Sequence, residues 1–104
     1  MKAEALKGHL DGLILATLSG GPAHGYAIAQ TLRGRSGGAF DLPEGTLYPA
    51  MHRLERGGLV SSEWSTESGR RRRTYRLTSV GERTLGERRR EWRTFASAVE
   101  AVLA

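Results

Sequence analysis

The segment 44–56 places the strongest constraint on the fold, because its residues separate onto two sides of one helix. Leu47, Met51 and Leu54 recur at steps of three and four residues, the spacing of a single helical face. A second set of side chains is left on the other face: Thr46, Tyr48, Pro49, His52 and Arg53. The pattern predicts a short helix that buries one face and presents the other to a ligand.

The ends of this helix are marked by residues that cannot continue it. Pro49 lacks a backbone N–H and is tolerated only within the first turn, so the helix is predicted to begin at about Gly45 or Thr46. Pro43 introduces the helix, and the glycine pair 57–58 is predicted to end it.

An arginine-rich hairpin is predicted directly after this helix. Residues 59–64 form a strand-like run, residues 66–69 a polar turn, and residues 70–78 a second strand. The second strand holds five arginines within seven residues, with no acid between them: Arg70, Arg71, Arg72, Arg73 and Arg76. A short helix followed by a hairpin with this charge is the layout of a winged helix-turn-helix.

Within the hairpin, strand alternation should place Arg70 and Arg72 on the side opposite Arg71 and Arg73. Only about half of the arginines are therefore expected to touch DNA at once. Trp64 and Tyr75 are predicted to pack the hairpin against the preceding helix.

The rest of the chain is predicted to be helical. Leucines and Ile14 form an apolar stripe over residues 5–18, and a second helix covers about residues 25–33, with His24 as a capping or packing residue. Ser79 and Glu82 match a capping box that opens a long terminal helix.

The terminal helix carries a heptad stripe. Leu85, Trp92 and Val99 repeat every seven residues, and Phe95 and Val102 occupy the other seam position. This stripe is long for so small a chain, so part of it is predicted to pack on a second copy.

The predicted fold is mainly α with a small β-hairpin, organised as one structural unit. Residues 1–78 form a winged helix-turn-helix DNA-binding domain, and residues 79–104 form a C-terminal dimerisation helix.

The composition narrows the function. The chain has 104 residues and a net charge of +5, and all its basic residues except Lys2 and Lys7 are arginines. Arginine favours bidentate contacts to phosphate and guanine. The lack of cysteine removes thiolate catalysis and cysteine zinc sites, and it fits a cytoplasmic location. The three histidines are scattered without metal-ligand spacing, so no enzyme, cofactor or metal site is predicted.

The predicted DNA contacts fall into two groups. On a reading helix, Thr46, Tyr48, Pro49 and His52 are the candidates to meet base edges, and Arg53 could reach the backbone or a guanine. The arginines of the hairpin are candidates for phosphate or minor-groove contact.

Several short segments, in this order and spacing, resemble the PadR family of transcriptional regulators, of the short type with one C-terminal helix. They are residues 13–18, 21–28, 44–55, 57–60 and 69–78, with Trp64 and Gly81. The resemblance implies a bacterial or archaeal winged helix-turn-helix homodimer that binds double-stranded DNA at an inverted repeat, usually as a repressor. It places 46–49 on the recognition helix and the arginine run in the wing.

The sequence departs from the family pattern in two places. Many relatives have Lys-Tyr-Tyr in the wing where this chain has Arg73, Thr74 and Tyr75, and the short terminus lacks the large C-terminal bundle of longer relatives.

Some short relatives bind flat aromatic or cationic drugs between the subunits, against a tryptophan of the terminal helix. Trp92 matches that tryptophan, and Leu10, Ile14 and Phe95 are candidate walls for a small aromatic effector. The competing interpretation of Trp92 is simple packing in the dimer core.

Two other functions stay open at this point. A winged helix can act as a protein-interaction module without specific DNA binding, although such a module does not require an uninterrupted arginine wing. A nucleic-acid-modifying enzyme fragment would need an acidic or metal-binding cluster beside the basic face, and the sequence supplies none.

Overall fold

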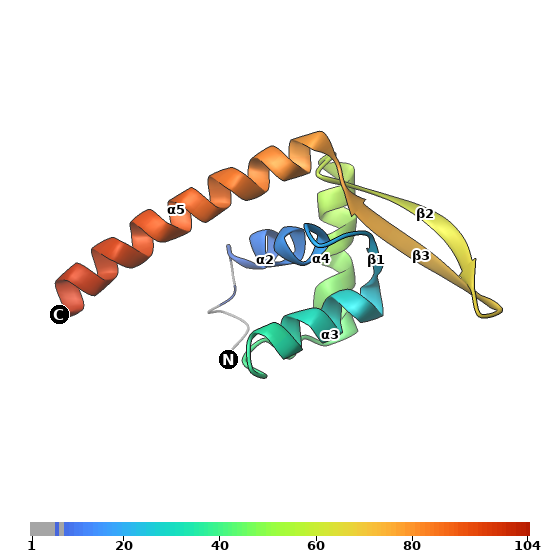
Figure 1. Ribbon diagram of the computed structural model, residues 1–104, viewed down its shortest axis with the longest axis horizontal. Coiled ribbons are helices and arrows are strands. Elements are labelled where there is room, and N and C mark those ends of the chain that lie inside the picture. The colour runs from blue at the N-terminus through green and yellow to red at the C-terminus, as the bar shows by residue number, and fades with distance from the viewer. Residues whose placement is uncertain (1–5, 7) are drawn as a thin grey trace.

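The computed structural model describes Leu6 and residues 8–104, and it shows a helical body from which a hairpin and one long helix extend (Figure 1). The elements in chain order are α2 (Leu10–Leu18), β1 (Ala23–His24), α3 (Gly25–Arg35), α4 (Glu44–Arg56), β2 (Val60–Glu67), β3 (Arg70–Leu77) and α5 (Ser79–Leu103). The predicted fold class, a mainly helical winged helix-turn-helix with a long C-terminal helix, is confirmed.

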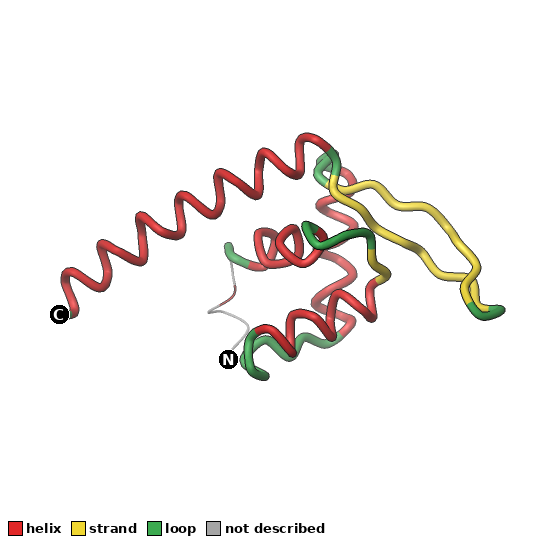
Figure 2. The backbone as a smooth tube through the Cα atoms, viewed as in Figure 1, coloured by secondary structure: helices red, strands yellow, loops and turns green. Residues whose placement is uncertain are grey.

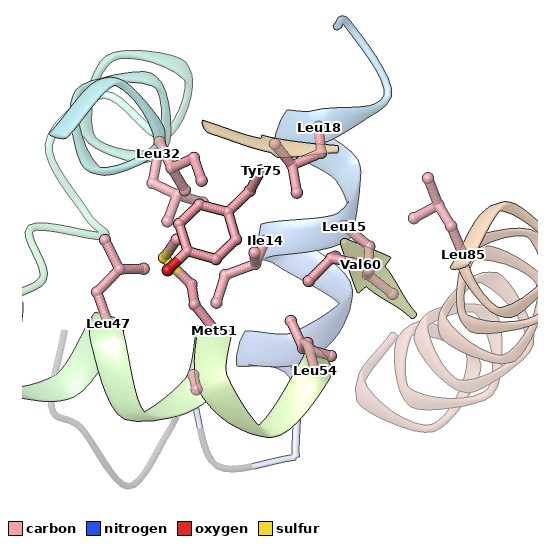
Figure 3. Packing of buried hydrophobic residues seen from close by; sticks show 12 residues of the cluster. Ile14, Leu15, Leu18, Leu32, Leu47, Met51, Leu54, Val60, Tyr75 and Leu85 are labelled. Carbon is pink, nitrogen blue, oxygen red and sulfur yellow. The ribbon is translucent and has the colours of Figure 1, made fainter. Parts of the chain in front are cut away.

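The core lies where α2, α3 and α4 meet the inner ends of β2 and β3. Figure 3 shows the ring of Tyr75 among aliphatic side chains of the three helices. The largest fully buried side chains are Tyr75, Ile14, Leu15, Ile28, Leu47, Met51 and Leu54. The predicted apolar face of 44–56 is thus the buried face of α4.

Helix α4 begins earlier than the position of Pro49 suggested. Its first residue is Glu44, with Pro43 as the N-cap, so Pro49 lies inside the helix. The N–H that Pro49 lacks would have bonded the carbonyl of Gly45, which is an exposed residue at the start of the helix. Water can take that carbonyl, and the proline is tolerated.

The predicted end of α4 is confirmed. Gly58 has a φ of +77°, and the N–H of Leu59 donates to the carbonyl of Leu54 over 3.0 Å. This Schellman motif turns the chain directly into β2.

The wing, residues 60–77, has a longer first strand and a tighter turn than predicted. β2 and β3 pair antiparallel from Val60–Leu77 to Glu67–Arg70, so the turn is only Ser68 and Gly69 rather than 66–69. Both turn residues have positive φ, +50° and +75°, as a two-residue hairpin turn of type I′ requires. The wing projects from the body as a two-stranded ribbon (Figure 2).

A third strand was not expected from the sequence. β1 pairs with β3 through Ala23–Tyr75 and His24–Thr74, which gives a sheet of order β1-β3-β2. The start of α3 is thereby fixed against the wing.

Two helix starts differ from the predictions. The N-cap of α5 is Thr78 rather than Ser79: its Oγ1 accepts from the N–H of Gly81 over 3.1 Å and donates to the carbonyl of Gly58 over 2.6 Å. The first predicted helix, 5–18, includes residues 5 and 7, which with residues 1–4 lie outside the described residues. Its described part, α2, begins at Leu10, because Gly8 has a φ of +86°.

Helix α5 leaves the body after its first turns. Gly81 and Leu85 are its only buried residues, and the rest extends outward on the side away from the wing (Figure 1). The chain therefore measures 54 × 28 × 21 Å. No helix in the described part of the chain is long and apolar enough to cross a membrane.

Candidate nucleic-acid interface

An open groove of about 800 Å³ lies between the start of α3, the outer face of α4 and the wing. Its lining residues are His24, Gly25, Tyr26, Tyr48, His52, Trp64, Arg70, Arg71, Arg72, Arg73 and Tyr75. Tyr48 and His52, which were predicted to read DNA, thus share one surface with four of the five wing arginines.

The other predicted reading residues lie beside this groove on α4. Thr46 is half-buried and Pro49 is exposed. Arg53 forms an ion pair with Asp11 of α2, with Nη2 and Oδ1 2.7 Å apart. Arg53 therefore already has an acidic partner in the free chain.

Tyr48 is placed by a glycine that the sequence reasoning did not single out. A Cβ atom at Gly25 would lie 2.6 Å from the hydroxyl oxygen of Tyr48 and 2.8 Å from two of its ring carbons. The ring of Tyr48 therefore lies directly on the first residue of α3, where only glycine leaves room for it.

His24 connects the start of α3 to the wing. Its Nδ1 accepts from the N–H of Ala27 over 3.3 Å, which confirms the predicted capping role, and its Nε2 lies 2.6 Å from Nη1 of Arg72. A neutral imidazole has one acceptor nitrogen, so the ring satisfies only one of these two donors at a time. Arg72 therefore lies against the start of α3 while the imidazole accepts from only one of the two groups.

Arg73 connects the wing to α4. Its Nε donates to Ser62 Oγ over 2.8 Å, and Ser62 donates in turn to Glu55 Oε2 over 2.5 Å. Nη2 of Arg73 lies 3.6 Å from the same carboxylate oxygen. The carboxylate of Glu55 thus holds Arg73 to α4.

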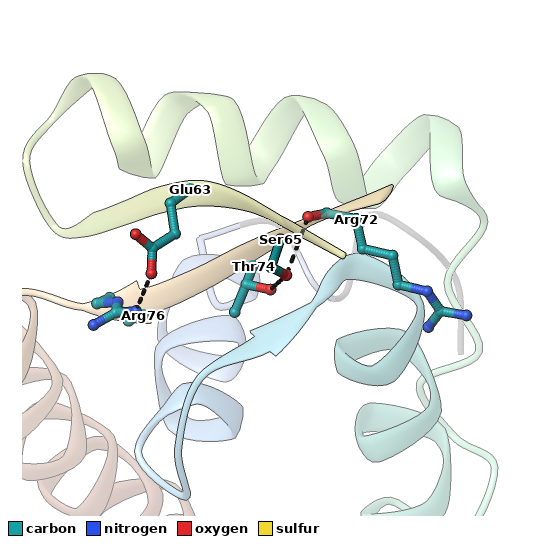
Figure 4. Close-up of polar contacts among 5 residues, drawn as sticks. All are labelled: Glu63, Ser65, Arg72, Thr74 and Arg76. Atoms are coloured by element: carbon teal, nitrogen blue, oxygen red, sulfur yellow. Dashed lines mark hydrogen bonds and ion pairs between the residues drawn. The ribbon is translucent and has the colours of Figure 1, made fainter. Parts of the chain in front are cut away.

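The outward face of the wing has its own polar contacts (Figure 4). Arg76 pairs with Glu63 of the neighbouring strand at 2.5 Å, and the hydroxyls of Ser65 and Thr74 lie 3.1 Å apart. The charge of Arg76 is therefore partly compensated locally.

Arg70 and Arg71 differ from the other wing arginines. In the described part of the chain, neither has an acidic side chain within 4 Å. The guanidinium carbon of Arg71 lies 4.9 Å from the centroid of the Trp64 ring, and that of Arg73 lies 5.5 Å from it. Arg71 and Arg73 thus share a face with Trp64, while Arg72 turns to His24, as strand alternation predicted.

The prediction for the two wing aromatics is half correct. Tyr75 is buried in the core with the inner face of α4, and this burial raises the pKa of its hydroxyl above the ordinary value. Trp64 does not pack on α4 in this way: 54% of it is exposed, and its ring contacts arginines instead. It lies too far out on the wing to enter the core.

The predicted dimer residues divide between core and surface. Ile14 and Leu85 are buried in this chain and Leu10 is half-buried, so Ile14 cannot line a surface cavity as predicted. The exposed members all lie on α5: Trp92 at 53%, Phe95 at 58%, Val99 at 36% and Val102 at 85%.

Comparison with known proteins agrees with this architecture. The profile of the PadR-like transcriptional regulator family matches residues 14–87. Transcriptional regulator Rv3488 of Mycobacterium tuberculosis is 42% identical over 76 residues, which cover 73% of this chain and 68% of that protein.

Solved structures show the same fold over nearly the whole length. A transcriptional regulator from Clostridium thermocellum aligns with a TM-score of 0.90 and 28% identity, covering 100% of this chain and 99% of that one. A PadR family transcription regulator from Clostridium difficile R20291 aligns with a TM-score of 0.84 and 36% identity, covering 92% and 99%. The chain therefore belongs to the PadR-like family of transcriptional regulators, which implies regulation through DNA binding rather than an enzymatic activity.

Proposed function

We propose that this protein is a dimeric repressor that binds an inverted repeat in double-stranded DNA, with α4 in the major groove and the wing on the neighbouring backbone. The observation that carries this proposal is the groove in which Tyr48 and His52 of α4 share a surface with Arg70 and Arg71, which form no ion pair within the described part of the chain. Base-reading side chains and free cations then meet the same stretch of DNA.

The reading role falls to the exposed face of α4. Tyr48 and His52 line the groove, Pro49 lies between them on α4, and Thr46 lies nearer the start of the helix. Arg53 would contact the DNA backbone or a guanine only after its ion pair with the carboxylate of Asp11 is broken.

The phosphate-binding role is unequal among the wing arginines. Arg70 and Arg71 are available at once, whereas Arg72, Arg73 and Arg76 already contact His24, Glu55 and Glu63 respectively. We assign the direct phosphate contacts to the first pair. The other three contribute positive potential and replace their present partners only where a phosphate comes close enough.

The second copy would pack on α5. Its apolar stripe is exposed in the single chain, and covering it with the same stripe of another copy removes apolar surface from water. A two-fold dimer would place its two α4 helices ~34 Å apart, one turn of DNA, so that they enter successive major grooves. Residues 1–78 would then bind cytoplasmic DNA and residues 79–104 would hold the dimer together.

A small aromatic effector is the finer part of the proposal. The ring of Trp92 meets His9 edge-on at 5.4 Å and lies 6.0 Å from the ring of Phe95, so three rings gather beside the α5 stripe. A flat ligand between two such clusters would change the separation of the α4 helices and release the DNA.

The first test is binding of the purified protein to the DNA upstream of its own coding sequence, with random DNA as competitor and salt as the variable. We expect competitor-resistant binding that weakens steeply with salt. Replacing Arg70 and Arg71 by alanine removes four phosphate contacts per dimer and should reduce the slope of log K against log salt by about 3 to 4.

Two outcomes would contradict the proposal. Binding that random DNA abolishes would leave a basic winged module without specificity. A salt slope that does not change in the double variant would remove Arg70 and Arg71 from the phosphate contacts, and a protein-docking role for the wing would then be favoured.

A further inference from the structure

Trp64 is an exposed tryptophan for which the core offers no explanation. It lies midway along β2, opposite Arg73 in the strand pairing and diagonal to Arg71. Its ring is more than half exposed, yet two guanidinium groups lie over it at 4.9 and 5.5 Å. A guanidinium over an indole face is attracted by the ring quadrupole, so the ring holds both cations in place.

The contacts of Trp64 continue into the recognition helix. Arg73 is fixed to α4 through Ser62 and Glu55, while its guanidinium also covers Trp64. Arg71 lies over the same ring, and among the described residues its guanidinium has no hydrogen bond or ion pair. The order of contacts is therefore Glu55, Arg73, Trp64, Arg71, from the rigid helix to the outer wing.

We propose that Trp64 is a positioning residue of the DNA interface, which sets the place of the Arg71 guanidinium relative to α4. The inference rests on the proposed DNA-binding function. It gives Trp64 a role that follows neither from the spacing of residues in α4 nor from the arginine run of β3. Arg71 is a long side chain that would otherwise lose many rotamers when it meets phosphate. The indole ring of Trp64 restrains Arg71 before DNA binds and so reduces the entropy that the side chain loses on binding. It also fixes the distance between the DNA contact of Arg71 and the DNA contacts of α4.

The test is a set of double-mutant cycles on affinity for the specific DNA site. We expect Trp64→Leu, which keeps an apolar side chain but loses the aromatic face, to weaken binding by about two- to fivefold per wing, or about 4- to 25-fold for a dimer. The loss should disappear in the Arg71→Ala background, because the residue that Trp64 positions is already gone.

Arg70→Ala provides the matched background. Arg70 is the neighbouring wing cation, also without an ion pair among the described residues, and the guanidinium groups that lie over Trp64 are those of Arg71 and Arg73 instead. The effect of Trp64→Leu should therefore persist in full when Arg70 is alanine. Trp64→Phe, which retains a weaker aromatic face, should recover part of the affinity.

Each result supports or overturns the inference. An affinity unchanged by Trp64→Leu, or a loss of equal size in both arginine backgrounds, would overturn it, the latter indicating a direct or purely structural role. If Trp64→Leu unfolds the wing, as far-UV circular dichroism would show, the same cycles are run with Trp64→Phe. Failure of the wild-type protein to bind DNA would instead overturn the proposed function itself.

Discussion

Tyr75 is the largest side chain enclosed in the core, and its ionisation makes the fold sensitive to high pH. Burial raises the pKa of its hydroxyl above the ordinary 10.0, while the nearby Arg73 guanidinium acts in the opposite direction with a smaller effect. The folded state therefore holds this proton more tightly than the unfolded chain does. The stability that results is fully present below pH 10.0 and is lost as the pH rises through the folded pKa.

We expect the melting temperature of the wild-type protein to fall above pH 10.0, and this fall to be smaller in Tyr75→Phe, which has no hydroxyl to ionise. Tyr26→Phe is the matched control, because Tyr26 is 60% exposed and its removal should leave the alkaline fall unchanged. Melting curves between pH 8 and 11 would measure all three. If the melting temperature falls equally in wild type and Tyr75→Phe at alkaline pH, ionisation of Tyr75 is not the cause of the fall.

At the residue scale, the sequence predicts which side chains carry charge but not which of them are already engaged. Five wing arginines within seven residues look equivalent, and period-two alternation separates only their faces. Their partners are set by tertiary contacts: Arg72 meets a histidine 48 residues away, and Arg73 meets a carboxylate on another element. The exposure of Trp64 depends on how far the wing projects, which no local pattern encodes.

At the element scale, the join between α3 and α4 depends on Gly25. Because a Cβ there would lie 2.6 Å from the Tyr48 hydroxyl oxygen, Gly25→Ala should push the Tyr48 ring away from α3. Tyr48 is half-buried and can turn toward solvent, and alanine is a better helix former than glycine. The fold should therefore survive, while affinity for the specific DNA site falls by about tenfold, the equivalent of one weakened contact of roughly 1.4 kcal/mol.

Gly34→Ala is the control for this substitution. Gly34 lies in the same helix, and nothing stands within 4 Å of the added Cβ. Melting temperature and DNA affinity would be measured for both variants. Equal affinity of the two variants would show that the Tyr48 position does not matter for binding.

The elements themselves were mostly predictable, because their signals are local. The apolar spacing of α4, its glycine stop and the alternating hairpin are all encoded within about fifteen residues, and the structure confirms them. β1 was missed because two residues carry no periodicity, and they become a strand only through pairing with β3 some 50 residues later. The turn at Gly8 was missed for a related reason, since the apolar stripe on either side of it looks continuous.

At the scale of the whole molecule, α5 is too long for the body that it leaves. Its 25 residues span about 37 Å, yet its buried residues are confined to Gly81 and Leu85 in the first two turns. The exposed stripe of Trp92, Phe95, Val99 and Val102 is the surface on which the proposed dimer depends. Specific binding of two half-sites, and any response to a ligand between subunits, would both require this surface.

We expect Phe95→Asp to convert the dimer to a monomer, because a carboxylate would have to be buried in an apolar interface. Ser97→Asp introduces the same charge two residues away, at an exposed position on the opposite side of α5, and should leave the dimer intact. Sedimentation velocity would give the mass of each variant, and titration with the specific site would give its affinity. A Phe95→Asp monomer would bind one half-site at a time, so its affinity for the specific site should fall by about 100-fold or more. Its basic wing would still bind random DNA. A dimer that persists in Phe95→Asp, with affinity equal to that of Ser97→Asp, would place the contact between copies elsewhere on the chain.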